Sequence, residues 1–516
     1  MLLGANVEVL DRVADSLSAD AGRLQDIRTL AQRAVHELRS GWDGADLVDL
    51  TNQWERMASP LLTAASASLD TYAARLRTQS AAQRATSGMD GGGQGPFPFG
   101  MLPLVAAGPF APGTGAATST GTPADTPAAT STETLSAVLS GIPSPPPPGA
   151  SPGDNASWWT SLSEQQQGHV IGHHPEWIGN HDGVAFAARD LANRAMIEGA
   201  RARLEDQQNH LERELADNRF GGAFTHDDAA LDHVTEKLAA LAEIDATLAK
   251  AGERQLILLD LSAERAQAAV ARGNVDTARD VAVFVPGLSA TVTGALKTYD
   301  SSMGQLQRRA ELEGSRVNHT GPTGAAVVTW IGYQAPQMGR ELLSANSVIS
   351  DHAAERGAEL LVPFLQGIDA ARDHDVHLTL LGHSYGSTLA GLALQQHTGV
   401  DDAVFFGSPG LGTDHLPDLL LDSGHAYYIE ARQDLVGDLG RFGADPSHLA
   451  GVEQASARDS VVVDPVTGER RHFREVVGHS SYLDDDSTSQ YNLSVVAGGV
   501  PDRRVHDDGA VVGNRR

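Results

Sequence analysis

The C-terminal half of the sequence predicts an α/β fold with a mostly parallel sheet. From about residue 280 onward, short apolar runs rich in β-branched and aromatic residues alternate with segments of helical periodicity. The runs lie at residues 281–285, 326–330, 376–381, 403–406 and 426–429. Continuous apolar strands joined by crossover helices are typical of a sheet covered on both faces, where ligands bind beyond the carboxyl ends of the strands.

The composition of the 516-residue chain is that of a soluble globular protein with more than one domain. No uninterrupted apolar stretch reaches the roughly 18 residues of a transmembrane segment, so we expect none. A formal net charge of −28 without a basic patch argues against a nucleic-acid partner, because phosphate backbones are repelled. Because cysteine is absent, disulfides, thiolate metal sites and a cysteine nucleophile are excluded.

Residues 1–87 predict a hairpin of two amphipathic helices. Apolar residues recur at helical spacing on both sides of the sequence Ser-Gly-Trp-Asp-Gly at 40–44, whose glycines and aspartate break the pattern. A hairpin of this size buries little surface alone, so we expect a helical partner or self-association through residues 1–87. The first residues lack a basic segment followed by a long apolar one, so no general secretory signal peptide is expected.

Residues 88–156 predict a disordered linker, because they are rich in Gly, Pro, Ala and Thr and carry almost no periodic apolar pattern. Residues 157–279 predict a helical region that packs on the following domain. Its clearest apolar stripe consists of Leu231, Val234, Leu238, Leu241, Ile244 and Leu248. Residues 280–516 then form the predicted catalytic domain.

The sequence Gly-His-Ser-Tyr-Gly at 382–386 predicts a serine nucleophile. With 54 glycines in the chain, a Gly-x-Ser-x-Gly pattern is weak evidence by itself. Here it directly follows the predicted strand at 377–381 and opens a helix-compatible run at 387–393. A strand, a sharp turn and a helix in this order form a nucleophile elbow, which makes Ser384 the expected nucleophile of an α/β-hydrolase fold.

In that fold the acid and the histidine of the triad follow the serine in this chain order. Asp434 lies in the loop after the predicted strand at 425–429 and is the expected acid, with Asp438 and Glu430 as alternatives. His479 follows a predicted last short strand at 473–477 and is the expected base. His383, inside the elbow, is expected to pack or hydrogen-bond there.

Acyl transfer also needs backbone N–H groups directed at the developing oxyanion. One is expected from Tyr385, directly after the nucleophile. The second is expected from Leu288 in the loop that follows the strand at 281–285, where Gly287 lets the backbone turn over the site. An ordinary strand-ending turn is the alternative interpretation of this loop.

These motifs together resemble an actinobacterial α/β-hydrolase family of unknown function. The matching segments are residues 158–159, 178–183, 189–190, 193–194, 285–291, 382–388, 407–410, 434 and 478–482. The resemblance covers about two thirds of the chain. It implies the fold and a triad of Ser384, Asp434 and His479, and it implies no particular substrate.

The N-terminal hairpin separately resembles the small helical proteins named for a Trp-x-Gly turn, here at 42–44, which are substrates or partners of type VII secretion. Many members carry a Tyr-x-x-x-Asp/Glu export signal, whereas Tyr72 is followed four residues later by Leu76. We therefore expect a cytoplasmic protein, or one exported without a classical signal peptide by a type VII-like route.

Other polar motifs do not change the prediction. The pairs His173-His174 and His181-Asp182 lack a convincing third ligand and are expected in loops, so neither a metal nor a cofactor is predicted. The acidic run at 484–486 is expected to be a solvated surface. The turn at Gly287 lacks the lysine of a phosphate-binding loop.

The sequence thus predicts a serine hydrolase of a small-molecule or lipid ester, with a thioester or an amide as alternatives. We expect the helices before residue 280 and the segment 435–471 to shape its substrate pocket. The competing hypothesis is a type VII secreted effector, or an envelope interaction protein, with a weak or inactive hydrolase domain.

Overall fold

The computed structural model describes residues 141–217, 226–317, 324–337, 352–434, 436, 443–464 and 466–506, with a few positions between residues 18 and 77. The chain divides into two units, Met1–Ala128 and Ala129–Arg516. In the first unit, the Ser66 hydroxyl donates to the carbonyl of Ala21, and Arg77 donates to the hydroxyl of Ser18. These bonds join the two predicted helices, and the Trp-x-Gly turn between them lies outside the described residues.

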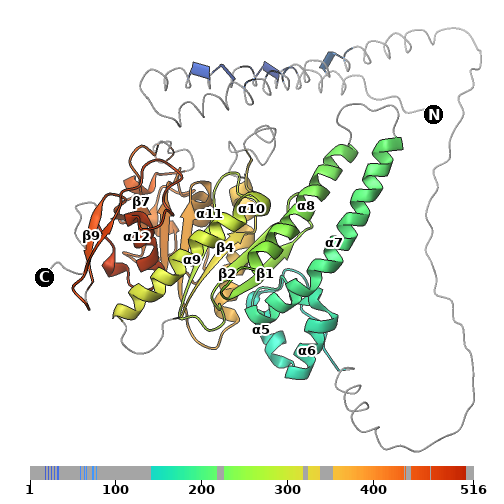
Figure 1. Ribbon diagram of the computed structural model, residues 1–516, viewed down its shortest axis with the longest axis horizontal. Helices are drawn as coiled ribbons and strands as arrows, with labels where there is room; N and C mark the ends of the chain where they lie inside the picture. Colours follow the sequence, from blue (N-terminus) through green and yellow to red (C-terminus); the bar gives the residue numbers. More distant parts are fainter. Residues whose placement is uncertain are drawn as a thin grey trace, which may run out of the picture. The chain divides into compact units, whose positions relative to one another are not determined.

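An eight-stranded sheet forms the centre of the second unit, in the order β1-β2-β4-β3-β5-β6-β7-β8 (Figure 1). The strands are β1 Arg254–Asp260, β2 Gln267–Arg272, β3 Asp280–Val285, β4 Ala325–Ile331, β5 His377–His383, β6 Asp402–Phe406, β7 Ala426–Ile429 and β8 Glu453–Ala455. Strand β2 pairs antiparallel with both of its neighbours, and the other pairings are parallel. The five runs predicted from the sequence are β3 to β7, which confirms the mostly parallel α/β-hydrolase fold.

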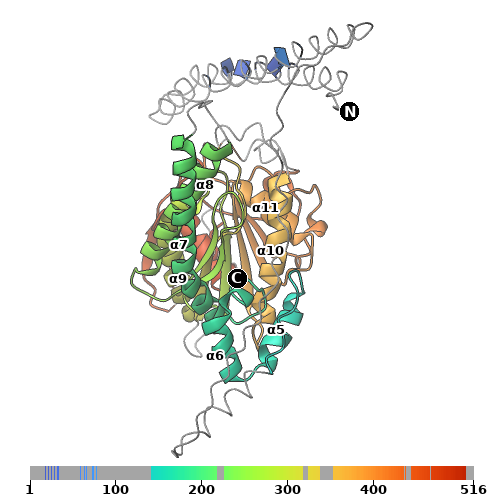
Figure 2. The same cartoon turned by 90° about the vertical axis from the view of Figure 1, so that its right-hand side faces the viewer.

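Helices cover both faces of this sheet (Figure 2). One face carries α7, α8, α9 and α12, and the other carries α10 and α11. The helices are α5 Pro152–Ser161, α6 Glu164–His173, α7 Phe186–Asp217, α8 His226–Leu248, α9 Val292–Val317, α10 His352–Ala370, α11 Tyr385–Leu394 and α12 Thr488–Ala497. Short 3₁₀ turns lie at Pro175–Trp177, Leu416–Asp418, Pro446–His448 and Pro501–Arg503.

The central strands are buried on both faces, which explains their continuous apolar sequences. Every residue of β3 and of β4 is buried. Phe284 of β3 packs between Tyr299 of α9 and Phe406 of β6, with ring centroids 5.0 and 6.2 Å away. Fully burying one such side chain stabilises the fold by roughly 1.5–3 kcal/mol, so these strands anchor the loops at their carboxyl ends.

The sheet extends further toward the N-terminus than the sequence predicts. Strands β1 and β2 lie within the segment 157–279, which was expected to be helical, so the sheet starts at Arg254 rather than near residue 280. The apolar run 256–259 of β1 was included in the predicted helical region, and β2 has a weak strand pattern because it contains three alanines and only one β-branched residue. Helix α5 likewise begins at Pro152, inside the predicted linker 88–156.

The predicted last strand at 473–477 is wrong. Phe473 ends β10, Arg470–Phe473, which pairs with β9, Ser460–Val463, in a separate two-stranded sheet. Residues 474 and 477 make only isolated bridges, to Ser487 and Arg432. The last strand of the main sheet is instead β8, a three-residue segment too short for a periodic pattern.

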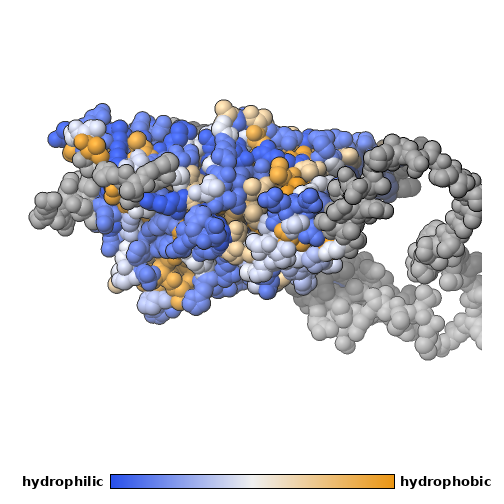
Figure 3. All heavy atoms as spheres, turned by 90° about the horizontal axis from the view of Figure 1, so that it is seen from below, coloured by the Kyte–Doolittle hydropathy of each residue, from blue (hydrophilic) through white to orange (hydrophobic). Residues whose placement is uncertain are grey.

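Figure 3 shows one face of the second unit, where hydrophilic side chains predominate and apolar ones form small separate groups. Among the described residues, no helix combines the length and the apolar character needed to cross a membrane.

Candidate active site

Ser384 lies in a sharp turn between the end of β5 and the start of α11. Its backbone has φ 54° and ψ −131°, a conformation that a residue with a side chain rarely adopts. The surrounding structure enforces this geometry, because the N–H of Ser384 donates to the carbonyl of Phe406 on β6 at 3.0 Å. The turn therefore presents the serine side chain at the carboxyl edge of the sheet, as a nucleophile elbow does.

Glycine at position 386 lets α11 approach β3 closely. A Cβ atom on Gly386 would lie 2.3 Å from the carbonyl oxygen of Val285 and 2.6 Å from that of Pro286. These atoms are backbone and cannot move aside. The glycine two residues after Ser384 is thus a steric requirement of the turn.

The structure brings the three predicted triad residues together. Nε2 of His479 lies 2.8 Å from Oγ of Ser384. Nδ1 of His479 lies 2.9 and 3.0 Å from the two carboxylate oxygens of Asp434. The hydrogen bond at Nδ1 selects the tautomer that leaves Nε2 as an acceptor for the serine proton.

Asp434 is a buried carboxylate with three kinds of donor. Besides His479, the hydroxyl of Tyr482 donates to Oδ2 at 2.6 Å, and the N–H of Val436 donates to Oδ1 at 3.0 Å. Burial alone would raise the pKa of Asp434, but the hydrogen bonds and the positive potential of His479 outweigh it and hold the pKa below its usual range. The carboxylate is therefore ionised at neutral pH and can stabilise a charged imidazole.

Of the two alternative acids, Asp438 lies outside the described residues. Glu430 lines a separate small cavity with Ser408 and Asp445. The carboxylate that contacts the imidazole of His479 is that of Asp434.

His383 packs against His479, as expected for a histidine inside the elbow. Its ring lies between Phe406 and His479, with both centroids 5.0 Å away, and its Nε2 donates to the carbonyl of His479 at 3.1 Å. Burial, followed by repulsion from His479, lowers the pKa of His383 to about 4. His383 is therefore neutral near pH 7 and supports the backbone of His479.

Two further residues of the site, Gly407 and Tyr482, lie in the matching segments but had no predicted role. The hydroxyl of Tyr482 accepts from the N–H of Ala431 at 2.9 Å while it donates to Asp434. Gly407 follows β6 with φ 57°, and a Cβ there would lie 2.9 Å from Oδ2 of Asp434 and 3.1 Å from Cε1 of His479. The available signals were positional: Gly407 directly follows the strand β6, and Tyr482 lies three residues after His479.

The loop after β3 passes directly over Ser384. A Cβ on Gly287 would lie 2.6 Å from Cβ and 3.1 Å from Oγ of Ser384. The hydroxyl of Tyr333 donates to the carbonyl of Pro286 at 2.8 Å and so fixes the loop. Leu288 is the next residue of this loop after Gly287, and Tyr385, the first residue of α11, directly follows Ser384.

The histidine pairs singled out above are engaged in other contacts. Asp182 pairs with the buried Arg189 at 3.0 Å. The expected loop position of His173 is wrong, because His173 is the last residue of α6, where its ring stacks on that of His169, one turn earlier, at 4.2 Å. Within the part of the chain that the structure describes, no group of three His, Asp or Glu side chains has the arrangement of a metal site.

The mostly parallel sheet, with helices on both faces, is an α/β-hydrolase fold. A family described as alpha/beta hydrolase matches residues 262–444. An uncharacterized protein of Mycobacterium tuberculosis strain H37Rv is 33% identical over 267 residues, covering 50% of this chain and 97% of that relative. A second uncharacterized protein of that strain is 31% identical over 298 residues, covering 55% of this chain and 43% of the relative. The chain therefore belongs to this α/β-hydrolase family.

Solved structures with a similar fold include a hyperthermophilic esterase from the archaeon Pyrobaculum calidifontis. It is 12% identical, with 57% of this chain and 96% of that chain covered and a TM-score of 0.28. The carboxylesterase EstE1 from a metagenomic library is 14% identical, with 53% and 96% covered and a TM-score of 0.30.

Proposed function

We propose that this protein is a serine hydrolase that cleaves a carboxylic ester through an acyl-enzyme on Ser384. The observation that supports this activity is the continuous chain of hydrogen bonds from Ser384 through His479 to the ionised Asp434. A serine hydroxyl is a weak nucleophile by itself and needs such a positioned base.

In the first half of the reaction, Oγ of Ser384 attacks the ester carbonyl and Nε2 of His479 accepts its proton. The charged imidazole is stabilised by Asp434, which holds Nδ1–H. The N–H groups of Tyr385 and Leu288 stabilise the oxyanion, and each such donor contributes about 3–4 kcal/mol in related chemistry. His479 then returns the proton to the leaving alcohol, and the acyl group remains on Ser384.

In the second half, His479 accepts a proton from water, which attacks the acyl-enzyme. The carboxylic acid leaves and the proton returns to Ser384. Thioesters and amides follow the same steps with a different leaving group. The strong negative charge of the chain favours a neutral ester over an anionic one as substrate.

The test is covalent labelling by a fluorophosphonate probe. Wild-type protein is expected to be labelled at Ser384, and the variants Ser384→Ala and His479→Ala are expected to lose labelling and several powers of ten in ester turnover. Ser480→Ala is the matched control, because this exposed serine directly follows the base. Unlabelled wild-type protein that is correctly folded would refute the proposal.

A panel of nitrophenyl esters of increasing acyl length then defines the substrate. The length at which kcat/KM stops rising reports the depth of the acyl pocket.

A further inference from the structure

A cavity with polar side chains lies near the amino ends of β3 and β4, whereas Ser384 lies at the carboxyl ends of the strands. It has a volume of about 380 Å³. Because β2 runs antiparallel to its neighbours, its carboxyl end at Arg272 lies beside the amino end of β4, where Ala325 begins that strand. The side chains that line the cavity include Glu253, Arg272, Asn274, Gln307, Arg308 and Glu311.

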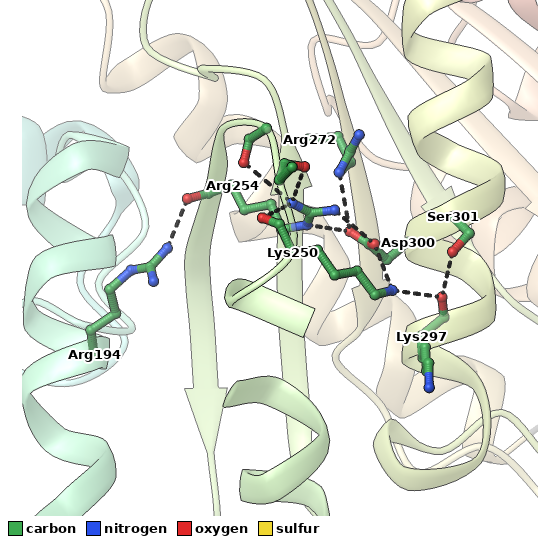
Figure 4. A network of polar contacts seen from close by, with 9 residues as sticks. Arg194, Lys250, Arg254, Arg272, Lys297, Asp300 and Ser301 are labelled. Carbon is green, nitrogen blue, oxygen red and sulfur yellow. Dashed lines mark hydrogen bonds and ion pairs between the residues drawn. The ribbon is translucent and has the colours of Figure 1, made fainter. Parts of the chain in front are cut away.

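Behind this cavity, three cations surround a single buried carboxylate (Figure 4). Asp300 of α9 is only 1% exposed. It accepts two hydrogen bonds from Arg254 at 2.8 and 3.1 Å, and one from Lys250 at 3.0 Å. Nη1 of Arg272 lies 4.0 Å from the same carboxylate. Asp300, Arg254 and Lys250 together carry one net positive charge, and Arg272 adds another.

The position of Arg272 is built into the fold. Its side chain is 13% exposed. It lies against Gly304 of α9, where a Cβ would approach Nη2 to 2.7 Å and Cζ to 2.9 Å, so a larger residue would displace it. Among the described residues, its ion pair is the long contact with Asp300. Burial, followed by repulsion from Arg254, lowers the pKa of Arg272, which indicates that its charge is poorly compensated.

The other charged side chains that line the cavity are those of Arg308, Glu253 and Glu311. Arg308 lies four residues after Gly304 on α9 and lines the same cavity. The carboxylate of Glu253 accepts from Asn274 at 3.0 Å, and that of Glu311 accepts from Gln307 at 2.7 Å, so both are bonded to neutral amides. The two arginines and two glutamates of the lining balance, and the network of Lys250, Arg254 and Asp300 behind them adds one positive charge.

We propose that this cavity binds a small oxyanion, a carboxylate or a phosphate group, through the guanidinium groups of Arg272 and Arg308. Guanidinium groups hold such anions by paired N–H donors, and these bonds gain strength where water is partly excluded. The site is separate from the triad and independent of the proposed hydrolysis.

The test is calorimetric titration of the full chain with inorganic phosphate and, in a second arm, with acetate, at constant ionic strength set by chloride. Wild-type protein is expected to bind one equivalent of at least one of the two anions with millimolar affinity. Arg308→Gln is expected to weaken binding at least fivefold, and Arg272→Gln to abolish it. Arg203→Gln, which changes an exposed arginine on α7, and Ser384→Ala are expected to bind as the wild type does.

Arg308 is exposed, so Arg308→Gln keeps the test decisive even where Arg272→Gln fails to fold. Thermal unfolding in chloride alone checks that each variant is folded. The proposal is overturned by a wild type that binds neither anion, or by binding that persists unchanged in Arg308→Gln. Loss of binding in Ser384→Ala would also overturn it, because the anion would then occupy the active site.

Discussion

The hydroxyl of Tyr482 should matter for catalysis, although it does not contact the reacting serine. The variant Tyr482→Phe removes the 2.6 Å bond to Oδ2 of Asp434 and leaves the N–H of Ala431 without its 2.9 Å acceptor. A hydrogen bond to a charged group contributes about 1.5–3 kcal/mol. If the charged imidazole of the transition state depends on it to that extent, kcat/KM falls by roughly 10–100-fold, at about 1.4 kcal/mol for each factor of ten.

The assay is steady-state hydrolysis of a nitrophenyl ester, together with urea unfolding of the same samples. Tyr491→Phe is a matched control, because this buried tyrosine donates to the carbonyl of Arg503 at 3.1 Å and makes no contact with the triad. Both variants are expected to lose stability, and only Tyr482→Phe is expected to lose activity. Equal activity of the two variants would refute a catalytic role for the Tyr482 hydroxyl and leave it a structural one.

Three further predictions concern the same site. Gly407→Ala should lower kcat about 10–100-fold, because its Cβ would displace the carboxylate of Asp434 by contact at 2.9 Å; unchanged kinetics would contradict the packing. His383→Ala should lower kcat roughly tenfold with little change in KM, since it removes the support of the His479 carbonyl; an effect on KM alone in the ester assay would count against this role. Because the pKa of Asp434 is depressed, its contribution to stability is present above the ordinary carboxyl pKa and is lost as pH falls through the depressed value. Tyr482→Phe removes one cause of that depression, so urea unfolding should show a smaller loss of stability on acidification for this variant than for the wild type.

Much of the sheet was predictable because burial on both faces leaves a direct trace in the sequence. Strands β3 to β7 each contain a run of mostly apolar residues, and the strand-turn-helix at Ser384 is a local feature of consecutive residues. Strands at the edge of the sheet leave a weaker trace. Strand β1 contains the apolar run 256–259 but begins with Arg254 and Gln255, and β8 has only three residues, too few for a periodic pattern.

The supporting residues of the site were less predictable, because they are joined only by the tertiary structure. Asp434 and His479 could be assigned from chain order and loop position. Tyr482 lies 48 residues from the carboxylate that it contacts, and no periodicity connects the two. The same holds for Arg254 at the start of β1 and Asp300 on α9, which are 46 residues apart in the sequence.

Helix α9 runs from the carboxyl ends of the strands, near Leu288, to the cavity near their amino ends, yet we expect the two sites to be independent. It begins at Val292, just beyond Leu288, and reaches the anion cavity at Arg308, about 24 Å further along at 1.5 Å per residue. Between these points Met303 and Leu306 are fully buried and Asp300 is bonded to β1, so the helix is held along its length. Phosphate should therefore leave kcat unchanged in the wild type. A change in kcat that Arg308→Gln abolishes would mean that the two sites are coupled, through α9 or through β3, which runs from the cavity lining at Ala278 to the loop that carries Leu288.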